Sequence, residues 1–196
     1  MSVSVLPLAL EGPLLLTPQL FADARGFFFE SWNARSWRQL LLEHGQQPVD
    51  FTQDNHSRSS RGVLRGLHYQ LPPCPQAKLV RCVVGEIFDV VVDLRRGSPQ
   101  FGQWEGVYLS AENHQQLWVP EGFAHGFLTL SDHAEVLYKT TDFWSRECER
   151  SLRWDDPDLA IAWPLECLGG AAPLLAVKDA EAPDLTALIR RAEVFA

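Results

Sequence analysis

The stretch LVRCVVGEIFDVVVDL, residues 79–94, decides the fold class of this chain. It contains two runs, 79–84 and 86–94, that are rich in β-branched residues and are separated by Gly85. Short apolar runs of this composition that end at a glycine are typical of β-strands. We therefore predict two strands that break at Gly85.

Similar runs lie on both sides of this stretch. Residues 3–16, interrupted by Pro7, Gly12 and Pro13, predict a short edge strand, and residues 21–30 predict a turn at 23–26 followed by an aromatic strand. Further strands are predicted over residues 101–109, 116–120, 126–130 and 135–140. Many short strands with little helix indicate an all-β sandwich or jelly roll, in which inward-pointing polar residues are candidates for a ligand site.

Only two helices are predicted. Residues 33–44 have a candidate cap at Asn33 and a stop at Gly45, and residues 184–192 place leucines on one face. The segment between Trp144 and that second helix has the composition of coil wrapped over the barrel. The polar stretch 51–61 fits a solvated loop on composition alone.

Composition limits the class of protein. A length of 196 residues, 46% of them apolar, predicts a single domain over 1–196 with a substantial core. The net charge of −8 argues against nucleic acid as a partner, although a few local arginines could still bind a small anion. Four cysteines without Cys-x-x-Cys spacing, and no run long enough to cross a membrane, lead us to expect a reduced cytoplasmic protein with no membrane partner.

The segment 62–78 carries the first candidate for chemistry, His68, with Arg65 before it and Lys78 after it. Side chains alternate along a strand, so an extended segment would place residues 64, 66, 68 and 70 on one face and 65, 67 and 69 on the other. His125 and Tyr138 lie in or beside other predicted strands. Each of these polar residues alone could be a hydrogen-bonded core group, but several in one small barrel, with one or more carboxylates, predict a functional site.

Two chemistries compete for this site. A metal centre would want a second histidine where Gln70 stands, and Lys78 would repel the ion, which disfavours metal binding. Proton transfer next to a carbonyl needs a base, a donor for the enolate oxygen and an acid. His68, Lys78 and Tyr138 fit those roles in order, and Asp179 could orient the histidine.

Ten motifs, in order along the chain, carry a resemblance to a known family. They are DARGFFFE (23–30), QDNHS (53–57), GVLRGLHYQ (62–70), QAK (76–78), GEIFDV (85–90), VDLR (92–95), FGQW (101–104), LWVPEGFAHGF (117–127), LYK (137–139) and WDDP (154–157). The sequence resembles the dTDP-4-dehydrorhamnose 3,5-epimerase family from about residue 21 to about residue 183. So many long motifs in one order make the resemblance specific.

The resemblance implies a cupin-type double-sheet jelly roll with short flanking helices and a C-terminal coil and helix. It also implies a homodimer that uses no metal and no dissociable cofactor. The implied substrate is a dTDP-linked 4-keto-6-deoxy sugar, dTDP-4-dehydro-6-deoxy-D-glucose, epimerised at C3 and C5 toward dTDP-L-rhamnose. The 4-ketone acidifies both neighbouring C–H bonds, so one site can serve two carbons.

The resemblance also implies a role for each matching residue. His68 matches the general base and Asp179 its carboxylate partner, Tyr138 the acid on the opposite face, and Lys78 the group that stabilises the enolate, with His125 lining the same pocket. Phe143 and Trp144 stand where the family commonly has two tyrosines, and we expect either ring to stack on thymine. The other implied substrate-binding residues are Arg25, Glu30, Gln53, Asn55, Arg65, Glu149 and Lys178.

Three alternatives stay open at this stage. The first is a related enzyme that inverts only C3 or only C5, against which the retained Tyr138 argues. The second is a sugar-nucleotide-binding module without turnover, which would have no need of His68, Lys78 and Tyr138 together. The third is a metal cupin, which would hold stoichiometric metal.

Overall fold

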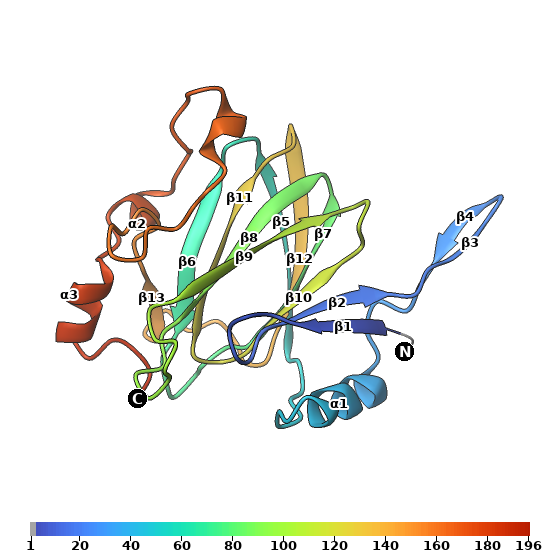
Figure 1. The fold of residues 1–196 in the computed structure, drawn as a ribbon, viewed down its shortest axis with the longest axis horizontal. Coiled ribbons are helices and arrows are strands. Elements are labelled where there is room, and N and C mark those ends of the chain that lie inside the picture. Colours follow the sequence, from blue (N-terminus) through green and yellow to red (C-terminus); the bar gives the residue numbers. More distant parts are fainter. Residues whose placement is uncertain (1–2) are drawn as a thin grey trace.

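The computed structural model describes residues 3–196, and it consists mainly of two antiparallel sheets that face each other (Figure 1). The six-stranded sheet has the order β1 (Val3–Pro7), β2 (Leu14–Pro18), β10 (Gln116–Val119), β7 (Lys78–Val84), β12 (His133–Thr140) and β5 (Gln53–Ser60). The five-stranded sheet has the order β13 (Glu149–Ser151), β6 (Leu64–Gln70), β11 (Phe123–Thr129), β8 (Glu86–Asp93) and β9 (Trp104–Ser110). The predicted all-β double-sheet jelly roll is confirmed.

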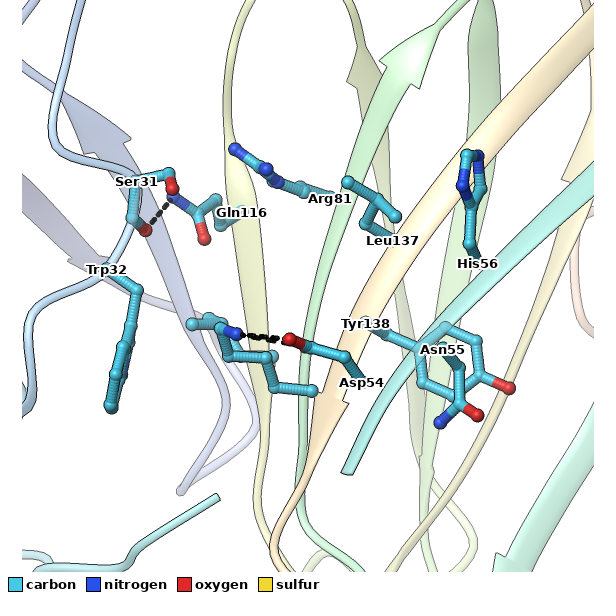
Figure 2. A pocket seen from close by; sticks show the side chains of 11 residues that line it. Ser31, Trp32, Asp54, Asn55, His56, Arg81, Gln116, Leu137 and Tyr138 are labelled. Atoms are coloured by element: carbon cyan, nitrogen blue, oxygen red, sulfur yellow. Dashed lines mark hydrogen bonds and ion pairs between the residues drawn. The ribbon is translucent and has the colours of Figure 1, made fainter. Parts of the chain in front are cut away.

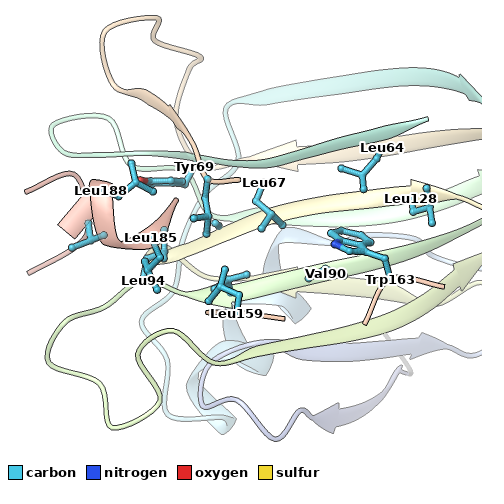
Figure 3. Close-up of a cluster of buried hydrophobic side chains, with 14 of the residues drawn as sticks. Leu64, Leu67, Tyr69, Val90, Leu94, Leu128, Leu159, Trp163, Leu185 and Leu188 are labelled. Carbon is cyan, nitrogen blue, oxygen red and sulfur yellow. The ribbon is translucent and has the colours of Figure 1, made fainter. Parts of the chain in front are cut away.

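Three apolar clusters hold the layers together. One fills the space between the sheets, where Val80, Val91 and Leu117 are fully buried. A second lies on the outer face of the five-stranded sheet, where the C-terminal segment covers β6, β8 and β11 (Figure 3). Leu188 is fully buried there, and burying one such leucine stabilises the fold by roughly 1.5–3 kcal/mol.

The third cluster joins the outer face of the six-stranded sheet to helix α1 (Ala34–Glu43). The Asn33 side chain accepts hydrogen bonds from the backbone N–H groups of Arg35 and Ser36, at 3.1 and 3.3 Å, and so begins the helix. Gly45 follows the helix with φ +71°. The predicted helix over residues 33–44, its cap and its stop are confirmed.

The first sixty residues contain two differences from the sequence-based prediction. Residues 3–16 form a hairpin of β1 and β2, not one edge strand, and β2 continues into the sheet beside β10. Residues 51–61 are not a solvated loop, because β5 pairs with β12 over eight residues, from Gln53 to Ser60. The prediction failed there because β5 carries polar side chains on both faces, so apolar alternation gives no signal.

The predicted turn at residues 23–26 joins β3 (Phe21–Asp23) to β4 (Gly26–Phe28). This small hairpin projects away from the two large sheets (Figure 1). Phe21, Phe27 and Phe28 are 58%, 59% and 69% exposed. A hairpin with three exposed phenylalanines is an apolar surface of the kind that contacts a partner.

The later strands appear where they are predicted, with shifted ends, except that β13 lies in the segment after Trp144 that was predicted to be coil and pairs there with β6. β11 begins at Phe123, so His125 lies inside the strand and not in the turn before it, and β9 begins at Trp104. The C-terminal segment contains η1 (Leu165–Leu168), α2 (Val177–Ala180) and α3 (Leu185–Arg190), and Asp184 caps α3 by accepting from the N–H of Ala187 at 2.7 Å. No helix in residues 3–196 is long and apolar enough to cross a membrane.

A bulge in β6 inverts the predicted alternation of side chains at Arg65. His68 pairs with His125, and Arg65 pairs with Phe127. β6 therefore advances three residues over a stretch in which β11 advances two. β6 and β11 lie close together at this bulge, because a Cβ on Gly66 would lie 2.6 Å from the Cα of Gly126. As a result Arg65 lines the same cavity as His68, whereas Leu67 belongs to the cluster on the outer face.

Candidate active site

A cavity of about 520 Å³ opens between the two sheets, and most of the predicted polar residues line it. An adjoining hollow of about 120 Å³ shares five of its residues and adds Gln53 and Asn55. The charged and polar residues that line the larger cavity are Ser57, Arg65, His68, Lys78, His125, Tyr138, Glu149, Lys178 and Asp179. Trp144, Phe127 and the segment 174–176 supply apolar walls.

His68 and Asp179 form a hydrogen-bonded pair. His68 Nε2 lies 2.5 Å from Asp179 Oδ1, and the Asp179 carboxylate, in α2, is 2% exposed. An ionised carboxylate can only accept, so this contact assigns the proton to Nε2 and leaves Nδ1 as the basic nitrogen. Burial lowers the pKa of His68, and this effect outweighs the hydrogen bond that Nε2–H donates to Asp179, so the imidazole is neutral near pH 7.

The segment that carries Asp179 is fixed to the start of β6. The N–H of Leu64 donates to the carbonyl of Leu174 at 3.0 Å, and the N–H of Leu174 donates to the carbonyl of Gly62 at 2.8 Å. The backbone N–H of Gly66 points to the second oxygen of Asp179 at 3.5 Å. Asp179 therefore reaches His68 through contacts that span more than a hundred residues of sequence.

Lys78, the first residue of β7, brings a cation next to the histidine. Its side chain is 8% exposed, and Nζ donates to the carbonyl of His68 at 3.2 Å. Burial lowers the pKa of Lys78 to about 8, although the charges of Asp89 and Glu149 act in the opposite direction. An amine with this pKa is roughly nine-tenths protonated at pH 7.

Tyr138 faces the cavity from the opposite sheet. It lies on β12 of the six-stranded sheet, whereas His68 lies on β6 of the five-stranded sheet. Burial raises the pKa of Tyr138, and the charge of Arg65 opposes this only in part. The phenol therefore keeps its proton at neutral pH and is available as a donor.

His125 forms a second histidine–carboxylate pair beside the first. Its Nε2 lies 2.7 Å from Asp89 Oδ1, and both side chains are buried. The second oxygen of Asp89 is buried without a hydrogen-bond partner among residues 3–196. Asp89 is not among the residues predicted from the sequence, although a carboxylate in the middle of an apolar strand is a signal for a functional role.

The rim of the cavity is charged and aromatic. Lys178 Nζ donates to Glu149 Oε1 at 2.9 Å, and this bond lowers the pKa of Glu149 although burial acts to raise it. Trp144 lines the cavity and is 56% exposed. Phe143 is 64% exposed and lies outside the set of lining residues, so Trp144 is the ring that faces the cavity.

Two further predicted substrate-binding residues do not join this cavity. Arg25 lies in the projecting hairpin, where it pairs with Asp23, and Glu30 accepts a hydrogen bond from the side-chain amide of Asn33 at 3.0 Å. Neither residue lines the cavity between the sheets.

A separate hollow of about 210 Å³ lies against the outer face of the six-stranded sheet (Figure 2). There Asp54 pairs with Lys139 at 2.8 Å, and Gln116 donates to the carbonyl of Ser31 at 2.9 Å. These contacts neutralise the polar groups of this hollow locally. It lacks the histidines that a proton-transfer site would need, apart from the exposed His56.

The donor set around His68 suits proton transfer better than metal binding. Residues 3–196 contain no group of three or more His, Cys, Asp or Glu side chains that could hold an ion. Gln70 is engaged elsewhere: its amide donates to the carbonyls of Cys74 and Phe143 and accepts from the N–H of Ser145.

The fold and the family match together define a cupin-type jelly-roll isomerase, with a polar cavity between its sheets. The sequence profile described as dTDP-4-dehydrorhamnose 3,5-epimerase matches residues 7–187, and the chain belongs to that family.

Individual relatives agree with this assignment. The dTDP-4-dehydrorhamnose 3,5-epimerase of Pseudomonas aeruginosa is 59% identical over 172 residues, which cover 88% of this chain and 90% of the relative. The crystal structure of a dTDP-6-deoxy-D-glucose-3,5-epimerase from Legionella pneumophila, in complex with dTDP-4-keto-L-rhamnose, is 46% identical with a TM-score of 0.90 and covers 98% of this chain and 97% of its own. A 3'-monoepimerase from Streptomyces bikiniensis, in complex with dTDP-quinovose, is 38% identical with a TM-score of 0.86 over 96% and 91% of the two chains.

Proposed function

We propose that this enzyme epimerises dTDP-4-dehydro-6-deoxy-D-glucose at C3 and C5 to give dTDP-4-dehydro-L-rhamnose. The observation that carries the proposal is the buried His68–Asp179 pair, which shares one cavity with Lys78 and Tyr138. Family membership supports the choice of substrate.

In this mechanism His68 removes the proton from the carbon next to the ketone. The neutral imidazole presents Nδ1 as the base, and Asp179 stabilises the imidazolium that forms when Nδ1 takes the proton. Because burial lowers its pKa, this base is deprotonated and ready at pH 7.

Lys78 stabilises the negative charge that develops on the 4-keto oxygen. A buried ammonium exerts a stronger field than an exposed one, because little water screens it. The same oxygen carries the charge when C3 or C5 is deprotonated, so one lysine can serve both steps. We assign to His125, held by Asp89, the role of a second polar group along this wall.

Tyr138 returns a proton to the opposite side of the sugar ring. Inversion requires that the proton leave one face and return to the other, and His68 and Tyr138 project from opposite sheets. Side chains alone then carry the reaction, without a metal or a dissociable cofactor.

The nucleotide portion binds at the rim in this proposal. Arg65 and Lys178 supply positive charge for the diphosphate, and Trp144 supplies the ring that stacks on thymine. Gln53 and Asn55, in the adjoining hollow, supply polar contacts, and Glu149 orients Lys178.

We further propose that the enzyme is a homodimer and that the β3–β4 hairpin of each subunit reaches the cavity of its partner. Three exposed phenylalanines on this hairpin support the proposal. It also accounts for Arg25 and Glu30, which are candidate binding residues but lie outside the cavity of their own chain. We place the protein in the cytoplasm, because its four cysteines lack the pattern of a disulfide framework.

Deuterium exchange tests the reaction. The protein is incubated with the keto-sugar nucleotide in D₂O, and deuterium is located by NMR in wild type and in His68→Ala. Wild type should place deuterium at both C3 and C5, and His68→Ala, with an unchanged circular dichroism spectrum, should place it at neither. Exchange at one carbon only would make the enzyme a monoepimerase, and near-normal turnover by His68→Ala would remove the histidine from the mechanism.

Subunit mixing tests the dimer. His68→Ala and Arg25→Ala subunits are each expected to be weakly active alone. After mixing and exchange, heterodimers should regain activity, because one of their two cavities would combine an intact His68 with an intact Arg25 from the partner. An absence of recovery in mixtures that contain heterodimers by native mass spectrometry would contradict the shared site.

A further inference from the structure

A pair of thiols lies behind the rim of the cavity, outside the proposed mechanism. Cys148 precedes Glu149 and is buried, and Cys74 lies in the turn between β6 and β7 and is half-buried. The backbone brings them together, because the N–H of Leu71 donates to the carbonyl of Cys148 at 3.0 Å and the N–H of Cys74 donates to the carbonyl of Leu71 at 3.3 Å. Each thiol also shifts the pKa of the other, so the two sulfur atoms lie close enough to interact.

We propose that Cys74 and Cys148 are a reversible thiol–disulfide site that controls the segment carrying Trp144. Peroxide is the oxidant that we name for this site. The control of substrate binding rests on the proposed function, whereas formation of the disulfide does not.

The two thiols differ in pKa, as a nucleophilic cysteine and a resolving cysteine must. Hydrogen bonding from Ser145 and from the backbone N–H of Cys74 lowers the pKa of Cys148, whereas burial raises the pKa of Cys74. The thiolate is the nucleophile toward peroxide, so Cys148 reacts first and Cys74 resolves the product.

The chemistry balances in two steps. The Cys148 thiolate attacks one peroxide oxygen, an S–O bond forms, the O–O bond breaks, and the leaving hydroxide takes a proton to become water. The Cys74 sulfur then attacks the sulfenic acid, an S–S bond forms, the S–O bond breaks, and a second hydroxide takes the Cys74 proton. In sum, two thiols and one peroxide give one disulfide and two waters, and both sulfurs are oxidised.

The amide of Gln70 connects these thiols to the rim. It donates to the carbonyl of Cys74 at 2.6 Å and to that of Phe143 at 3.2 Å, and it accepts from the N–H of Ser145 at 2.8 Å. An S–S bond of about 2.0 Å would draw Cys148 away from Ser145 and toward Cys74. Trp144 and Glu149, which line the cavity, are the immediate neighbours of Ser145 and Cys148 in sequence.

Disulfide mapping tests the site directly. The full-length protein is treated with hydrogen peroxide, free thiols are blocked, and peptides are mapped without reduction in wild type, Cys74→Ser, Cys148→Ser and the control Cys167→Ser. We expect a Cys74–Cys148 disulfide in wild type and in Cys167→Ser, its removal by dithiothreitol, and its absence in the other two variants. Cys167 is the matched control because it is exposed and lies in η1, away from this pair.

Kinetics test the control of binding. The oxidised protein should show a KM for the keto-sugar nucleotide raised roughly tenfold, below the ~10²-fold loss that a 1 Å misplacement can cause, with KM restored by dithiothreitol. Oxidation of Cys148 to sulfinic acid without a disulfide, or oxidation of Cys167 while Cys74 and Cys148 stay reduced, would overturn the proposal. A mapped disulfide with unchanged KM and kcat would overturn the proposed effect of the disulfide on substrate binding at the rim. The activity of the reduced protein in the same assay tests the proposed reaction separately.

Discussion

Replacing Lys78 with methionine is expected to stabilise the fold and to remove most of the activity. Burial moves the pKa of Lys78 from its ordinary value near 10.5 to about 8. Each pKa unit corresponds to about 1.4 kcal/mol, so the folded protein holds the buried ammonium at a cost of about 3 kcal/mol at neutral pH. Methionine has a similar length and no charge, and it therefore removes this cost.

The expected gain is smaller than the full cost. The carbonyl of His68 loses the hydrogen bond from Lys78 Nζ, and an unsatisfied acceptor costs about 1–3 kcal/mol. We expect a net gain of about 1 kcal/mol, which raises Tm by roughly 2–4 °C for a chain of this length. The difference in stability between the two proteins also depends on pH. Wild-type stability should rise as pH increases from about 8 toward 10.5, because the unfolded chain still binds the Lys78 proton there and the folded chain does not.

Urea unfolding and the deuterium assay together measure the two effects. Activity of Lys78→Met should fall by about 10²–10³, the usual loss on removing one donor to an oxyanion. Lys139→Met is the control, because Lys139 lies on the neighbouring β12, pairs with the exposed Asp54, and should change stability by no more than about 1 kcal/mol. Both proteins are compared at one concentration, since subunit association shifts apparent stability. A Lys78→Met protein that is less stable than wild type, or that keeps activity within tenfold, would refute the reasoning.

Three further predictions concern the reaction itself. The value of kcat/KM should fall above about pH 8, where Lys78 deprotonates, and below the lowered pKa of His68, where the base becomes protonated. Lys78→Arg should move the alkaline limb of this profile to higher pH. An alkaline limb that does not move would show that another group causes it. Tyr138→Phe should still exchange a sugar C–H with D₂O but form epimerised product slowly, and product formation at the wild-type rate would show that another group supplies the proton. Trp144→Ala should raise KM about 10–100-fold, equivalent to the ~1–3 kcal/mol of one base–aromatic stack, with a smaller effect from Phe143→Ala; equal effects would place both rings on the base.

Local signals in the sequence were sufficient for much of the fold. The helix at residues 33–44 was predicted because its cap, apolar face and glycine stop lie within one short segment. Strands such as β7 and β8 were predicted because β-branched residues fill them. β5 was missed because its polar side chains face the cavity on one side and solvent on the other, so burial does not appear as hydrophobicity.

The site required information that is not local. His68, Lys78 and Tyr138 were expected to converge from strand periodicity and from the resemblance, and the structure brings them into one cavity. Strand periodicity could not predict the face of the sheet on which the Arg65 side chain lies, because the bulge opposite Gly126 inverts that face. Which ring faces the cavity, and where Arg25 and Glu30 lie, depends on how loops and hairpins leave the sheets, and no spacing rule encodes that.

The distance along the chain between His68 and Asp179 also has a consequence for folding. The two residues are 111 positions apart, so their contact closes a very long loop. We expect it to form only after the C-terminal segment has docked on the five-stranded sheet. During refolding from denaturant, circular dichroism of the sheets should therefore recover before enzymatic activity does. The proposed base is therefore held in place by Asp179 only once this long-range contact has formed.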